Sequence, residues 1–147
     1  MKDRLSRGFT AGITGGIAMN IFNYMSYYWF GLAKTRFLDY AAMFVYGKAP
    51  TNLAQVIFAQ ITQIVFAGFL GIILSYAFTY VTSENYLFKG WVFGIMCWFF
   101  IYAAGLIFNL PLLEKVALTT AISNFIGSSI YGIVSSKVLK HLDLSIR

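Results

Sequence analysis

The sequence predicts an all-α membrane protein built as a bundle of four transmembrane helices. The chain of 147 residues is 59% hydrophobic and 11% charged, whereas soluble domains carry about 25% charged residues. Its mean hydropathy is +0.72. The apolar residues form runs long enough to cross the hydrocarbon core, which is about 30 Å thick. Short polar segments separate these runs, so we expect residues 1–147 to form one integral membrane domain.

The first span is predicted over residues 8–30, a stretch of 23 residues without a charge. A basic N-terminus precedes it, and several aromatic residues stand at its end. A signal peptide is the alternative interpretation. Against it, the apolar run exceeds the roughly 7–15 residues of an h-region, and no good cleavage site follows. We therefore expect a retained span.

A short helix is predicted over residues 36–46, which are too few to cross the membrane. Asp39 follows Arg36 by three residues, so the two charges are within pairing reach on a helix. We expect this helix to lie in the membrane interface or over the mouth of the bundle. Gly47 and Pro50 should end it. One of its faces carries Phe37, Tyr40, Ala41 and Phe44.

Three more spans are predicted over residues 52–81, 89–110 and 116–136. The 30 uncharged residues of the second span would extend for about 45 Å as a helix. This span must therefore tilt, kink near a glycine or project beyond the membrane. Pro111 ends the third span, and the basic tail after the fourth span should extend its helix.

Charge distribution predicts the orientation of the chain. Four spans place both termini and the turn at residues 82–89 on one side of the membrane. That side carries seven of the 11 Lys and Arg residues, and the opposite side carries four. Because Lys and Arg are enriched in cytoplasmic segments, we expect a multi-pass protein with cytoplasmic termini. The seven are Lys2, Arg4, Arg7, Lys89, Lys137, Lys140 and Arg147, and the four are Lys34, Arg36, Lys48 and Lys115.

The second half of the chain repeats a pattern of the first half. Spans one and three share an opening, Arg7-Gly8-Phe9 with Gly12 and Lys89-Gly90-Trp91 with Gly94. Spans two and four match at a fixed offset. Span two contains Thr62-Gln63, Gly71-Ile72-Ile73 and Ser75, and the corresponding residues of span four are Ser123-Asn124, Gly132-Ile133-Val134 and Ser136. One interpretation is two tandem hairpins in parallel orientation. The other is chance similarity between glycine-rich spans.

Small residues recur at every fourth position along the spans. Helices in a membrane associate through close packing, which small residues permit. We expect these faces to look inward or toward a partner, and the glycine faces of spans one and three to form an oligomer or a contact with a larger complex. The packing glycines are Gly8, Gly12, Gly16, Gly71, Gly90, Gly94 and Gly132.

Five side-chain amides fall within or near the apolar slab: Asn20, Asn23, Gln60, Gln63 and Asn124. An unpaired amide there costs several kcal/mol. The amides should therefore bond across helices, for about 0.6–2 kcal/mol each, or line a polar path. Because none of them can carry charge, the sequence favours the bonds.

The sequence supports no catalytic site, metal site or cofactor. No Asp, Glu, Lys, Arg or His falls well inside a predicted span, and a single Cys97 and a single His141 cannot build a metal cluster. An enzyme acting on lipids would need an interfacial acid such as Asp39 or Glu114 facing a headgroup-sized pocket. The net charge of +6 does not indicate nucleic-acid binding, because the basic residues stand at span ends.

The third span and its exit read KGWVFGIMCWFFIYAAGLIFNLP. A basic residue, a glycine and an aromatic residue come first, then Gly94 and Trp98 four positions apart, and later Pro111. This pattern, with Thr119-Thr120 and Tyr131-Gly132 in the fourth span, resembles small four-span bacterial membrane proteins of the YqhR-like type. The resemblance implies a helical bundle in a bacterial cytoplasmic membrane, and it transfers no site residues.

Two functions remain open at this point. The favoured one is a non-enzymatic protein that acts in the lipid bilayer through contacts between helices, as a homo-oligomer or as a subunit of a membrane complex. The alternative is a transport or channel unit for a small solute or a lipid, with Asn20, Gln63 and Asn124 lining a path between the two hairpins.

Overall fold

The computed structural model describes residues 3–81 and 84–145, and within them the regular secondary structure is helical, without strands. This confirms the all-α class. Lys2, Arg147 and Thr82, which entered the predicted charge balance and turn, lie outside the described residues. The helices are α1 (Arg4–Tyr28), α2 (Phe37–Tyr46), α3 (Leu53–Tyr80), α4 (Tyr86–Ile107), α5 (Pro111–Glu114) and α6 (Leu118–Leu144).

Local capping explains where α1 begins, four residues before the predicted span. The carboxylate of Asp3 accepts hydrogen bonds from the backbone N–H groups of Leu5 and Ser6 at 3.3 and 2.9 Å. These groups have no partner within the helix, so the cap stabilises the extra turn. The hydrogen bonds from Ser6 also lower the pKa of Asp3 below its ordinary value.

The short helix α2 begins at the predicted ion pair. A carboxylate oxygen of Asp39 accepts from the backbone N–H of Arg36 at 2.8 Å, and the guanidinium of Arg36 contacts the other oxygen at 2.8 Å. The Asp39 carboxylate also raises the pKa of Arg36 above its ordinary value. Gly47 ends the helix at a φ of 68°, a left-handed conformation that glycine adopts without steric cost.

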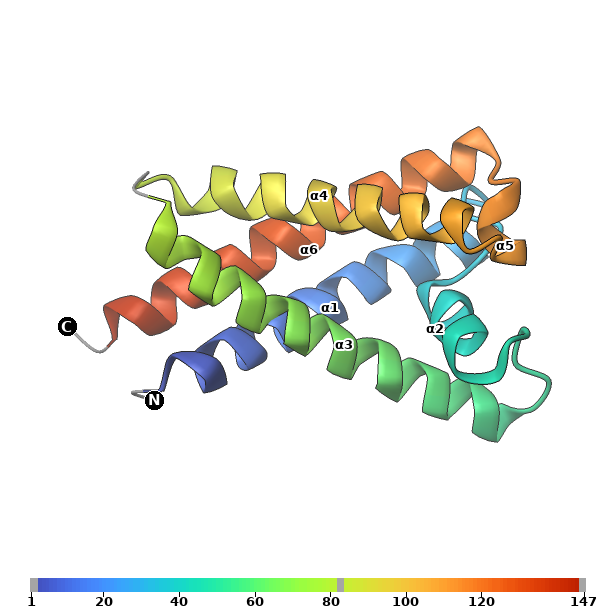
Figure 1. The fold of residues 1–147 in the computed structure, drawn as a ribbon, viewed down its shortest axis with the longest axis horizontal. Helices are drawn as coiled ribbons and strands as arrows, with labels where there is room; N and C mark the ends of the chain where they lie inside the picture. The colour runs from blue at the N-terminus through green and yellow to red at the C-terminus, as the bar shows by residue number, and fades with distance from the viewer. Residues whose placement is uncertain (1–2, 82–83, 146–147) are drawn as a thin grey trace.

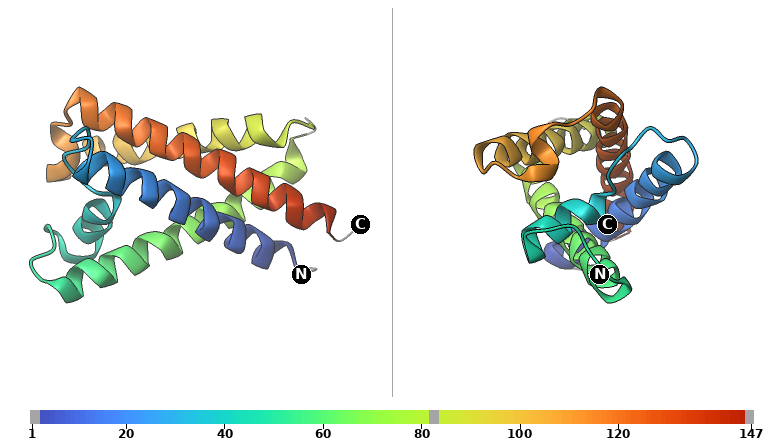
Figure 2. Two further views of the ribbon diagram at one scale, coloured as in Figure 1. Left: turned by 180° about the vertical axis from the view of Figure 1, so that it is seen from behind. Right: turned by 90° about the vertical axis from the view of Figure 1, so that its right-hand side faces the viewer.

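The four long helices form two pairs that meet at the centre of the molecule (Figure 1). Helix α1 packs against α3, α4 packs against α6, and α1 and α6 join the two pairs. Helices α3 and α4 meet at their shared turn and then diverge (Figure 1). Both chain ends lie at the same end of the molecule as this turn, while α2 and α5 lie at the opposite end (Figure 2).

Glycines bring α1 and α3 into backbone contact. A methyl group added at Gly71 would lie 2.5 Å from the Cα of Gly12, and one added at Gly8 would lie 2.8 Å from the Gly71 carbonyl oxygen. Gly16 lies against Ala67 in the same way. Such close approach is open only to residues without a larger side chain.

The same contacts recur between α4 and α6 at constant shifts in numbering. The shift is 82 positions from Gly12 to Gly94 and 61 positions from Gly71 to Gly132. A methyl group at Gly94 would lie 3.2 Å from the Cα of Gly132, and one at Gly90 would meet the Gly132 carbonyl. Two serine hydrogen bonds are related by the same shift of 61 positions. Ser75 Oγ donates to the Ile72 carbonyl at 2.8 Å, and Ser136 Oγ donates to the Ile133 carbonyl at 2.9 Å.

These contacts correct the expectation that spans one and three offer their glycine faces to a second subunit. Helices of the same chain already cover both faces, α3 on the side of Gly8 and Gly12 and α6 on the side of Gly90 and Gly94. The backbones touch there, so no room remains for another helix. Any contact with a partner must use a different surface.

Of the described helices, α3 and α4 are long and apolar enough to cross a membrane. Only 28% and 17% of their most apolar stretches are buried, whereas the core helices of a soluble fold are mostly covered. Large side chains such as Phe58, Phe69 and Phe99 are more than half exposed. Helices α1 and α6 are richer in glycine, serine and asparagine, and they occupy the centre.

Candidate functional site: an apolar cleft between two helix pairs

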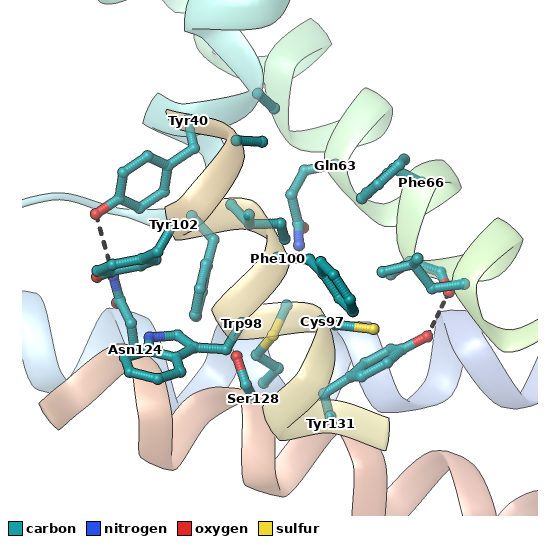
Figure 3. Close-up of a pocket in the computed structure, with 18 of the residues that line it drawn as sticks. Tyr40, Gln63, Phe66, Cys97, Trp98, Phe100, Tyr102, Asn124, Ser128 and Tyr131 are labelled. Carbon is teal, nitrogen blue, oxygen red and sulfur yellow. Dashed lines mark hydrogen bonds between the residues drawn. The ribbon is translucent and has the colours of Figure 1, made fainter. Parts of the chain in front are cut away.

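A cleft of about 720 Å³ lies between α3 and α4, where these helices diverge (Figure 3). Helices α1 and α6 form its floor, and α2 closes one end. Phe66 and Leu70 of α3 and Phe93, Phe100 and Ile101 of α4 line its walls. None of the described residues that line it carries a charge. The cleft therefore offers an apolar surface with a few neutral polar groups.

The face of α2 that carries Phe37, Tyr40, Ala41 and Phe44 forms the closed end of this cleft. The opposite face of α2 is the more deeply buried one, because Leu38 and Ala42 pack against Ala59 of α3. The short helix thus packs between α3 and the end of the cleft.

Asn124 of α6 is the centre of the polar end of the cleft. Its side chain is fully buried, and its amide nitrogen donates to the hydroxyl oxygens of Tyr40 at 3.0 Å and Tyr102 at 2.9 Å. The Tyr40 hydroxyl also shares a hydrogen bond of 2.7 Å with Thr35. One amide thereby connects α2, α4 and α6, as Figure 3 shows for Tyr40.

Three of the other predicted amides, Asn20, Gln60 and Gln63, form a network between α1 and α3. The Asn20 amide nitrogen donates to Gln63 Oε1 at 2.6 Å and to the Gly16 carbonyl at 2.8 Å. Gln60 donates to the same Gln63 oxygen at 3.1 Å and accepts from the hydroxyl of Tyr24. These groups bond to each other across α1 and α3, which is the arrangement expected of structural bonds between helices.

Asn23 has a third role, at the connection between α1 and α2. Its buried Oδ1 accepts from the backbone N–H of Phe37 at 2.9 Å, at the start of α2. Nearby, the Ser26 and Ser123 hydroxyls share a hydrogen bond of 2.5 Å between α1 and α6. The structure therefore distributes the five predicted amides over three places and brings only Gln63 and Asn124 to the cleft.

Tyrosine hydroxyls are the functional groups that the sequence reasoning missed. Besides Tyr40 and Tyr102, Tyr131 crosses the floor of the cleft, and its hydroxyl donates to the Ala67 carbonyl at 2.7 Å (Figure 3). A tyrosine in the middle of a predicted span is a usable signal, because its hydroxyl needs a partner when it is buried.

The size of a few side chains explains why the cleft is open. The shift of 82 positions relates residues of α1 to residues of α4, and the shift of 61 positions relates residues of α3 to residues of α6. By this correspondence, the closed contact between α1 and α6 is equivalent to the open side between α4 and α3. Gly15 lies against Ser135 and Tyr131, and Gly127 lies near Met19. Their counterparts, Cys97 for Gly15 and Phe66 for Gly127, are larger and line the cleft. Small residues close one side, and large ones hold the other apart.

Disrupting the Asn20–Gln63 bond should weaken the bundle measurably. We expect Asn20→Ala and Gln63→Ala each to lower the free energy of unfolding by about 1–2 kcal/mol, and the double variant to lose less than the sum. The coupling is read from a double-mutant cycle of denaturant unfolding in detergent micelles. Exposed Thr14 of α1 supplies the control as Thr14→Ala. Additive losses would contradict a direct bond.

The acids proposed for a lipid-modifying enzyme do not meet in this cleft. Asp39 is bound to Arg36 and to the start of α2, and it is not part of the cleft lining. The side chain of Glu114 lies outside the described part of the chain.

Comparisons with protein-family models, with curated proteins and with solved structures gave no match. The chemistry of the cleft must therefore be inferred from its own residues.

Proposed function

We propose that the chain is a non-enzymatic four-span membrane protein that binds an apolar chain of a lipid in the cleft between α3 and α4. Exposed apolar side chains on α3 and α4 support the membrane setting, because soluble monomers rarely expose a large contiguous apolar surface. Helices α1 and α6 then cross the membrane at the centre, where α3 and α4 cover part of their polar residues.

Aromatic and basic residues support the placement in a bilayer. Trp29 and Phe30 are exposed at the end that carries α2, and Tyr80 and Phe88 are exposed at the other end. Such rings favour the interface between membrane and water. The resemblance to YqhR-like proteins supports a bacterial cytoplasmic membrane. The surplus of Lys and Arg at the end that carries the termini supports cytoplasmic termini.

The cleft itself carries the functional proposal. Its volume of about 720 Å³ is in the range of pockets that enclose a small ligand, about 300–1,000 Å³. It lies between the two hairpins that share the glycine contacts, and repeat interfaces are where many transporters bind substrate. Its walls are apolar and face the side that we assign to lipid, so a hydrocarbon chain fits better than a polar solute.

Adjacent residues of α4 allow a matched test by photocrosslinking. Phe99 and Phe100 are each 62% exposed, but only Phe100 lines the cleft. We expect p-benzoyl-phenylalanine at position 100 to capture a lipid after detergent extraction and purification, and the same group at position 99 to capture none. Ala104→Phe, which fills the cleft, should abolish the adduct, whereas Ala103→Phe outside the lining should not. Mass spectrometry of the purified chain reads the adduct.

The same experiment separates the lipid from a protein partner. The exposed apolar residues of α3 and α4 are also the surface left for a homo-oligomer or a membrane complex, now that the glycine faces are filled. A protein-sized adduct at position 100 would favour that second candidate. Equal lipid capture at positions 99 and 100 would show only bulk bilayer and would contradict a specific cleft.

A further inference from the structure

We propose that the polar end of the cleft binds the hydroxyl group of an uncharged long-chain lipid, an inference that rests on the proposed function. Asn124, Tyr40 and Trp98 all line the cleft and come from three different helices, α6, α2 and α4. Figure 3 shows them together at one side of the cavity. Most of the remaining lining is apolar, with Gln63 and Ser128 among its few other polar residues, and it would take the hydrocarbon chain.

Two buried atoms at this end have unused hydrogen-bonding capacity. Asn124 uses its nitrogen for both tyrosines, and its Oδ1 has no hydrogen-bond partner among the described residues. The indole Nε1 of Trp98 is also buried, close to the Tyr102 hydroxyl but without a well-aligned hydrogen bond. Buried polar groups are nearly always satisfied in folded proteins. The two atoms lie beneath the polar end of the cleft with almost no accessible surface, so they offer one acceptor and one donor to a ligand that displaces the side chains above them.

A hydroxyl group is the simplest match for that pair, because it both donates and accepts. It would donate to Asn124 Oδ1 and accept from Trp98 Nε1. A charged headgroup would find no counter-charge, since the described lining has no Lys, Arg, Asp, Glu or His, and an unpaired charge in an apolar site is costly. A water molecule could satisfy the same two atoms, so the test must separate a ligand hydroxyl from water.

Cys97 supplies the readout, because it is the sole cysteine of the chain and lines the cleft (Figure 3). The rate of its alkylation by N-ethylmaleimide is measured in the purified native chain against increasing ligand. The two probes are oleyl alcohol and oleyl methyl ether, which share the chain and differ in the hydroxyl proton. We expect both to protect Cys97, with the alcohol effective at about one-tenth of the ether concentration.

Variants locate the hydroxyl. Trp98→Phe and Asn124→Leu should each reduce the preference for the alcohol, while Ser128→Ala, which alters another hydroxyl of the lining, should preserve it. The comparison of the two probes in the native chain needs no substitution, so it stands even where a variant fails to fold.

The outcomes separate this inference from the proposed function. Equal protection by alcohol and ether would overturn the hydroxyl site, with water filling the pair of atoms, and would leave lipid binding intact. A preference that survives both Trp98→Phe and Asn124→Leu would also overturn it. Absence of protection by either probe, together with no adduct at position 100, would overturn the proposed function itself.

Discussion

Replacing Gly71 with leucine is expected to prevent α1 and α3 from packing and to give a chain that aggregates on detergent extraction. A single methyl group at this position would lie 2.5 Å from the Cα and 2.6 Å from the nitrogen of Gly12. Both are backbone atoms, which cannot move aside as a side chain can. Overpacking a core costs about 1–3 kcal/mol where neighbours can relax, so we expect a loss beyond that range. Size-exclusion chromatography and thermal unfolding in detergent measure it.

The control for this prediction is Thr79→Leu on an exposed part of α3, which should shift the midpoint little. Gly71→Ala should fall between the two, because it adds one methyl group to the same contact. Gly132→Leu should reproduce the effect of Gly71→Leu, since Gly132 holds the equivalent position between α4 and α6. Unchanged unfolding of both leucine variants would mean that the glycine contacts do not hold the pairs together.

The long helices and the ion pair at the start of α2 could be predicted from the sequence because they depend on short-range patterns. Long uncharged runs predicted the four long helices, and the spacing of Arg36 and Asp39 predicted the ion pair that begins α2. Each of these features requires only residues that are neighbours on one helix. The extension of α1 to Arg4 could not be seen in the same way, because it follows from the cap made by Asp3 rather than from hydropathy.

The cleft could not be predicted, because it depends on which of two equivalent sides stays open. In a chain with two similar hairpins, α1 can meet α6 and α3 can meet α4 by the same geometry. The sizes of residues such as Gly15 and Cys97, or Gly127 and Phe66, favour closing the side between α1 and α6. Its polar end also needs Tyr40, Tyr102 and Asn124, which are remote in sequence and meet only in the folded chain.

The largest electrostatic effect is expected at Arg7 and Asp143, which join α1 and α6 near the chain ends. Arg7 Nη1 lies 2.8 Å from Asp143 Oδ1, and the two side chains are only 10% and 21% exposed. Removing one partner leaves a largely buried charge uncompensated, which costs about 3–5 kcal/mol in buried pairs. We expect Asp143→Asn to lower the free energy of unfolding by about 3 kcal/mol, the lower end of that range.

A double variant distinguishes the buried charge from a loss of packing. Arg7→Met with Asp143→Leu removes both charges and keeps apolar bulk, so stability should return close to that of the native chain, as in other buried pairs replaced together. Lys140→Met, at an exposed position of α6, serves as the control and should change stability by no more than about 0.5 kcal/mol. A double variant as unstable as Asp143→Asn would contradict this account. Recovery of stability in the double variant would mean that the ion pair is dispensable for packing α1 against α6. The small residues along that contact would then be sufficient to keep this side closed while α3 and α4 stay apart.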